Sequence, residues 1–176
     1  MGWFGKPSHQ KSISTMMDLF ARLYDQTTDG KSGNCPKLKA KDSHLRYLLF
    51  CAATTYVACA DQAGNTPTLV NDFTHRVINT AIQVDPEKML GGPLTNPQET
   101  ATQAWKYFQD YLEQWSVIIG MMPHNQPGAG GLLAGMIYHT ESDGSPSSED
   151  TERLFQMSKW FMVTLSDLSR EFKRQT

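Results

Sequence analysis

The sequence has few of the features that mark common catalytic or membrane proteins. Its three cysteines, Cys35, Cys51 and Cys59, form no CxxC pair, so neither a disulfide framework nor a cysteine zinc site is expected, and a reducing compartment such as the cytoplasm is favoured. The apolar stretch at 47–60 has 14 residues, fewer than the roughly 20 that a membrane span needs. The first residues, MGWFGKPSHQ, contain no apolar run, so we expect no secretory signal and no membrane partner.

Charge is also scarce and nearly balanced. The chain of 176 residues carries 16 Lys and Arg against 18 Asp and Glu, a formal net charge of −2. This balance gives no global attraction to the phosphate backbone of nucleic acids, so a nucleic-acid partner is not expected. The 39% apolar content is typical of an ordinary globular protein.

Strand-like alternation of useful length is missing, and apolar residues recur instead at helical spacing. The sequence therefore predicts an all-α, single-domain bundle of five long or medium helices and a short sixth near 130–140. Residues 47–60 are apolar or small around the whole circumference, which predicts a central helix at about 44–61 around which the others pack. We expect a flexible N-terminal arm at 1–11 and one helical domain at 12–176.

Helix starts are signalled by capping residues followed by proline. Thr66-Pro67 and Asn96-Pro97 each combine an N-cap with proline at the first helical position, and Glu99 follows Asn96 at the spacing of a capping box. The helix that begins at Pro97 has the longest apolar stripe, and Pro123 is expected to end it.

The glycine cluster at 128–131 does not form a phosphate loop. A GxGxxG motif fails because Leu133 occupies its sixth position, and the preceding segment is predicted to be helical, whereas phosphate loops follow a strand. The pattern favours a turn and then a short helix, in which Gly131 and Gly135 would allow close contact with another helix.

Catalytic and metal motifs are incomplete. Asp72 and His75, three residues apart, could supply only two metal ligands and are more typical of a helix-surface pair. Cys35 has lysines nearby in the sequence but no histidine tied to it by spacing. We therefore predict no metal, no cofactor and no catalytic residues.

Two groups of residues could contact partners. Trp3 and Phe4 in the arm, and Met89, Leu90 and Leu94 in a predicted loop, are candidate partner-binding residues, although a loop tucked over the bundle would bury the latter three. The lysine cluster is a weak candidate anion site, since such runs are usually solvated linkers. Its members are Lys31, Lys37, Lys39 and Lys41.

Two functions remain open from the sequence. The first is a small non-catalytic helical interaction module, an adaptor, regulator or inhibitor, whose partner is another protein, a second copy of the chain included (a homodimer). The alternative is an enzyme or ligand sensor with a small-molecule pocket in the bundle. That pocket would be lined by His75, His124, Tyr138 and His139.

Overall fold

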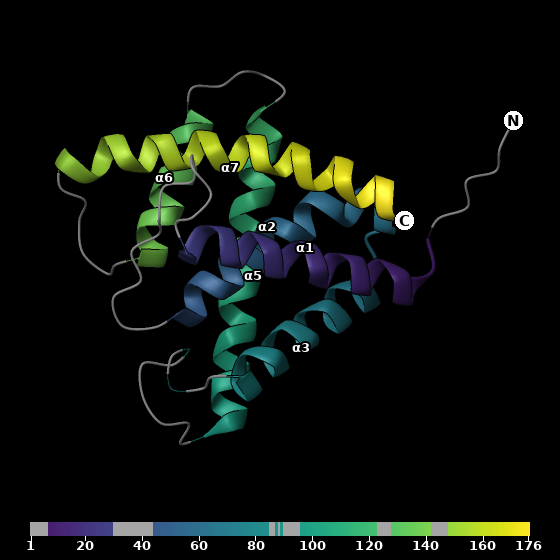
Figure 1. Ribbon diagram of the computed structural model, residues 1–176. Coiled ribbons are helices and arrows are strands. Elements are labelled where there is room, and N and C mark those ends of the chain that lie inside the picture. Colours follow the sequence, from purple (N-terminus) through teal and green to yellow (C-terminus); the bar gives the residue numbers. More distant parts are fainter. Residues whose placement is uncertain are drawn as a thin grey trace, which may run out of the picture.

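The computed structural model describes residues 7–29, 44–84, 87, 89, 96–122, 128–141 and 148–176. Over these residues the chain forms helices and no strand, which confirms the all-α prediction (Figure 1). The helices are α1 (His9–Asp29), α2 (His44–Ala63), α3 (Pro67–Val84), α5 (Pro97–Met121), α6 (Gly128–Glu141) and α7 (Ser148–Gln175).

The first helix begins earlier than the sequence analysis placed it. The Ser8 hydroxyl accepts a hydrogen bond from the backbone N–H of Lys11 at 3.3 Å, which is the geometry of an N-cap. Because Ser8 caps the helix, regular structure starts at His9, and the predicted start of the helical domain at residue 12 is three residues too late.

Two other helix starts lie where the capping signals place them. The Thr66 hydroxyl accepts from the backbone N–H of Leu69 at 3.2 Å, and α3 follows from Pro67. At the start of α5, the Asn96 side chain accepts from the backbone N–H of Glu99, and its amide donates to the Glu99 carboxylate, both at 3.3 Å. These bonds satisfy backbone donors that the first turn of a helix otherwise leaves without partners.

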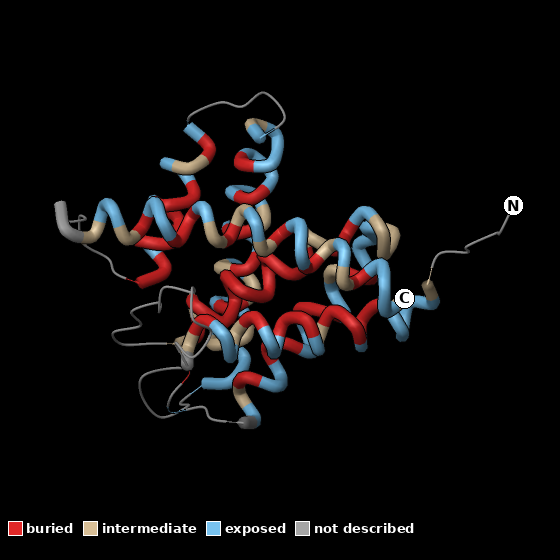
Figure 2. Tube along the Cα trace, turned by 45° about the horizontal axis from the view of Figure 1, so that its top comes forward, coloured by how far each residue is buried: buried red, intermediate tan, exposed pale blue. Residues whose placement is uncertain are grey.

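Helix α2 forms the centre of the bundle. It packs against α1, α3, α5, α6 and α7, and 13 of its 20 residues are buried, on every side of the helix. Figure 2 shows this buried segment enclosed by helices whose outer faces are exposed. A helix without a polar face has no stable place at the surface, so burial on all sides follows from its composition.

The core of the bundle is aromatic around Phe50 of α2. Its ring meets Phe161 of α7 edge to face at 4.8 Å and lies parallel to Trp115 of α5 at 6.2 Å between ring centroids. The buried Trp115 indole N–H donates to the Thr54 hydroxyl at 3.2 Å, and this hydroxyl donates to the Phe50 carbonyl. The indole is thereby fully buried without an unsatisfied donor.

Candidate functional site

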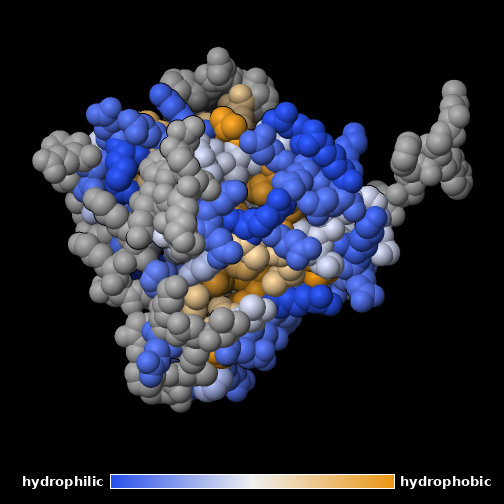
Figure 3. Space-filling model, viewed as in Figure 1, coloured by the Kyte–Doolittle hydropathy of each residue, from blue (hydrophilic) through white to orange (hydrophobic). Residues whose placement is uncertain are grey.

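The paired ends of α5 and α6 form a surface without charge. No Asp, Glu, Lys or Arg occurs between Glu113 and Glu141. The C-terminal end of α5 and the N-terminal end of α6 extend beyond α7 at the top of Figure 1, and Figure 3 shows apolar surface where α5 ends. Four large apolar side chains are exposed on these two ends, although a stable fold normally buries such groups. They are Val117, Ile119, Met122 and Leu132.

One face of α6 carries two glycines with open space beside them in the part of the chain that the structure describes. A Cβ atom built on Gly131 or on Gly135 would have no heavy atom within 4 Å. The opposite face of the helix is different, because Leu133 and Ile137 are fully buried. The close helix contact that the sequence predicted for these glycines is therefore not made inside the bundle. We call this surface, Gly131, Gly135 and the four exposed apolar residues of the two ends, the α5–α6 end.

The C-terminal half of α6 is held firmly against α5. The Tyr111 hydroxyl of α5 and the Thr140 hydroxyl of α6 form a buried hydrogen bond at 3.0 Å, and Thr140 also donates to the Met136 carbonyl at 2.8 Å. Burial raises the pKa of Tyr111 to about 12, while the bond to Thr140 opposes this rise. The phenol is therefore neutral at physiological pH, and its hydroxyl can act as a hydrogen-bond donor.

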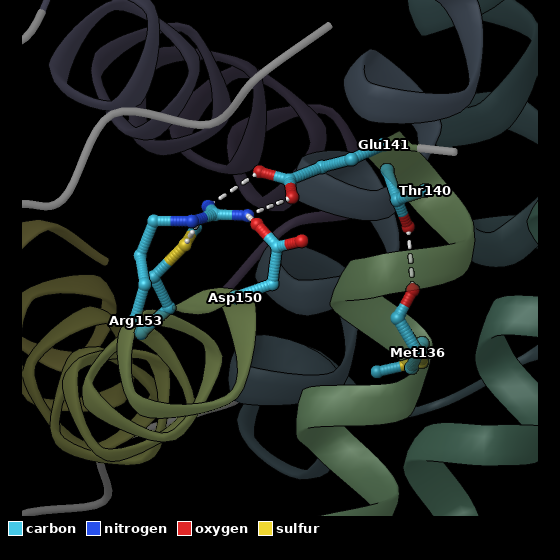
Figure 4. Close-up of polar contacts among 6 residues, drawn as sticks. Met136, Thr140, Glu141, Asp150 and Arg153 are labelled. Carbon is cyan, nitrogen blue, oxygen red and sulfur yellow. Dashed lines mark hydrogen bonds and ion pairs between the residues drawn. The ribbon is translucent and has the colours of Figure 1, made fainter. Parts of the chain in front are cut away.

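An ion pair between a buried carboxylate and a partly buried guanidinium joins the same end of α6 to α7. Arg153 donates from its two terminal nitrogens to both carboxylate oxygens of Glu141, at 2.9 and 2.5 Å (Figure 4). Asp150 lies 3.7 Å from the same guanidinium. The hydrogen bond to Glu141 raises the pKa of Arg153, although burial acts in the opposite direction. Because Thr140 and Glu141 both lie at the C-terminal end of α6, these contacts join that end of the helix to α5 and α7.

A second group of polar side chains lines a cleft between α1 and α3. The cleft has a volume of about 440 Å³. His9 Nε2 and Asp72 Oδ2 lie 2.7 Å apart across it. The partner of Asp72 is therefore His9, whereas the sequence spacing predicts a pair between Asp72 and His75. The lining includes His9, Gln10, Asp72, His75, Arg76 and Asn79.

The other side of His75 borders a neighbouring cleft between α3 and α5. Its volume is about 420 Å³, and none of the described residues that line it is charged. The imidazole of His75 stacks on the half-buried indole of Trp105, with ring centroids 5.9 Å apart. Ala101 and Ile78 contribute apolar surface, and Asn71, Asn79 and Gln98 contribute side-chain amides.

Most of the predicted partner-binding residues lie outside the described part of the chain. This holds for Trp3, Phe4, Leu90 and Leu94. Met89 is described, and it is buried in the core, with its sulfur 4.0 Å from the Tyr24 hydroxyl. Of the two alternatives for Met89, burial under the bundle is the correct one, so it offers no exposed contact surface. The lysine cluster, Lys31, Lys37, Lys39 and Lys41, and Cys35 also lie outside the described residues.

The residues of the predicted central pocket are distributed over different helices. His75 belongs to α3, which packs against α1, α2 and α5, whereas Tyr138 and His139 belong to α6, which packs against α2, α5 and α7. Tyr138 is buried and His139 is exposed, and neither lines a cleft beside His75. His124 lies outside the described residues. The spacing of residues in the sequence could not predict the neighbours of His75, because His9 and Trp105 approach it only through tertiary packing.

The described cysteines lie in the core. Cys51 and Cys59 are buried, and burial raises the pKa of the Cys59 thiol to about 12, so the Cys59 thiol stays protonated and weakly nucleophilic. Over the same described ranges, no three His, Cys, Asp or Glu side chains come together as metal ligands. Helices with the length and apolar content to cross a bilayer are also missing from this part of the chain.

The chain matches no protein-family model, no curated protein and no solved structure. Functional inference therefore depends on the two surfaces described above, the α5–α6 end and the clefts that meet at His75.

Proposed function

We propose that the chain is a small non-catalytic helical interaction module, which binds another polypeptide at the α5–α6 end. The observation that carries this proposal is the glycine face of α6 beside exposed apolar side chains. A helix face of this kind lets a second helix approach closely, and Leu132, 49% exposed, would be buried by it. Burying a leucine side chain contributes about 1.5–3 kcal/mol.

The proposed partner is an α-helix of another protein molecule, and a second copy of this chain is the first case to test. A twofold interface brings each residue near its own copy, so a charge close to the axis would face a like charge. The α5–α6 end meets this condition because the segment between Glu113 and Glu141 carries no Asp, Glu, Lys or Arg. The free, buried thiol of Cys59 fits a cytoplasmic location, which belongs to the same proposal.

The test uses two lysine substitutions at exposed helical positions. Gly135→Lys places charge and bulk on the α5–α6 end, and its Cβ has open space. Val163→Lys changes α7 at a residue that is 61% exposed and serves as the matched control. Sedimentation over a concentration series should show a dimer for the natural sequence and for Val163→Lys, and a monomer for Gly135→Lys.

A second experiment tests for a partner other than a second copy of the chain. It replaces Leu132 with a photo-crosslinking amino acid. If the chain is monomeric at every concentration, adducts formed at position 132 in extracts of the native cell, and lost with Gly135→Lys, identify that partner. A monomeric chain without such adducts would refute the proposed function.

A further inference from the structure

The two clefts that flank α3 adjoin each other and differ in chemistry. His75 and Asn79 line both clefts, so these two side chains form the ridge over which a bound molecule would pass. Each half has a volume of about 420–440 Å³, which lies within the range of roughly 300–1,000 Å³ of small-molecule sites. The α5–α6 end lies on other helices, so this site does not depend on the interaction surface.

The half between α1 and α3 favours an anion. Arg76 is exposed, and within the described residues no hydrogen bond or ion pair involves its guanidinium. Among the described residues, the one acidic side chain that lines this half is Asp72, and His9 Nε2 lies 2.7 Å from its Oδ2. The guanidinium of Arg76 and the amides of Gln10 and Asn79 supply hydrogen-bond donors to this cleft, and a guanidinium binds carboxylates and phosphates through paired hydrogen bonds.

The half between α3 and α5 favours a neutral, planar and apolar group. Trp105 and His75 present aromatic surface, and Ala101 and Ile78 add aliphatic surface, while the described lining of this half holds no charged residue. Aromatic rings gain from parallel or edge contacts with such surfaces. The amides of Asn71 and Gln98 offer donors and acceptors at the rim.

We propose that this site binds a small aromatic anion, a carboxylate or phosphate attached to a planar ring. The ring lies against Trp105 in the neutral half, and the anionic group reaches past His75 and Asn79 to the guanidinium of Arg76. Both parts are required, because neither half encloses a ligand by itself. The chemistry is shared by aromatic carboxylates and aromatic phosphates, and the site takes either.

The experiment titrates the full chain with 1-naphthyl phosphate and 1-naphthoate, followed by calorimetry and by the backbone and indole NMR signals. Both anions should bind and should shift the signals of His75, Arg76 and Trp105. The neutral 1-naphthol lacks the anionic group and should bind about tenfold more weakly, the loss that one charge-assisted contact brings. Inorganic phosphate lacks the ring and should also bind about tenfold more weakly, because the contact with Trp105 is lost.

Two arginine variants separate the specific contact from general charge. Arg76→Gln should lower the affinity for both anions about tenfold, and it leaves the fold intact because Arg76 is exposed. Arg174→Gln, at an exposed position near the end of α7, removes the same charge elsewhere and should leave affinity unchanged. The proposal is overturned if neither anion binds at millimolar concentration, if 1-naphthol or inorganic phosphate binds as tightly, or if the two variants have equal effects.

Discussion

Three glycines of the α5–α6 hairpin offer a direct test of the packing described above. Gly120, Gly131 and Gly135 lie in helices, and a Cβ at each position would meet no heavy atom within 4 Å. Replacing all three by alanine therefore adds methyl groups without displacing neighbours. Because alanine loses less backbone entropy than glycine on folding, the triple variant should be more stable than the natural sequence.

The expected gain follows from the position of each glycine. Gly135 is interior to α6 and should contribute about 1 kcal/mol, whereas Gly131 in the first turns and Gly120 in the last turn of α5 should contribute about 0.5 kcal/mol each. The total of about 2 kcal/mol corresponds to a rise in Tm of about 4–8 °C for a chain of this size.

Urea unfolding followed by circular dichroism measures this change. The midpoint should rise and the slope should stay the same, because the surface exposed on unfolding hardly changes. Gly128→Ala is the matched control, since its Cβ would lie 2.9 Å from the end of the Met121 side chain, and it should give no gain. The measurement is made at protein concentrations at which the chain is monomeric. A triple variant that is then destabilised, or as stable as the natural sequence, would show that these glycine faces are not open and would refute the reasoning.

Three further predictions concern the interior. Phe161→Ala empties the centre of the aromatic core, where Phe161 is 0% exposed, and should lower the free energy of unfolding by about 3–5 kcal/mol; a loss below about 1 kcal/mol would contradict the described packing. Arg153→Ala removes the bidentate partner of the buried Glu141 carboxylate and should cost about 2–4 kcal/mol by urea unfolding, whereas an unchanged midpoint would show that the pair contributes nothing. The pKa of Tyr111 is about 12 in the folded state against an ordinary 10.0, so its contribution to stability is complete below pH 10 and is lost as pH rises from 10 toward 12. Urea midpoints over this pH range should fall less steeply for Tyr111→Phe than for the natural chain, and equal slopes would argue against a buried neutral phenol.

The fold was predictable from local signals, because helix formation here depends on short spacings. Thr66 and Asn96 cap α3 and α5, as the Thr-Pro and Asn-Pro patterns predict. The apolar circumference of 47–60 likewise predicts burial on all sides of α2. The Ser8 cap was missed because no proline or capping-box glutamate follows it, and the start of the first helix was placed too late.

The functional surfaces were less predictable, because they depend on which helix faces meet. The separation of Gly131 and Gly135 indicated a close helix contact, but only the packed bundle shows that no described helix lies against this face. Asp72 illustrates the same limit. Its nearest histidine in sequence is His75, yet its partner is His9, which lies 63 positions away.

The central position of α2 has a consequence for synthesis on the ribosome. α2 ends at Ala63, whereas α7, which covers part of it, begins only at Ser148. At ordinary translation rates this interval lasts on the order of ten seconds. During that time the apolar surface of α2 that α7 later buries is exposed. We therefore expect the nascent chain to bind chaperones that hold apolar segments until synthesis is complete.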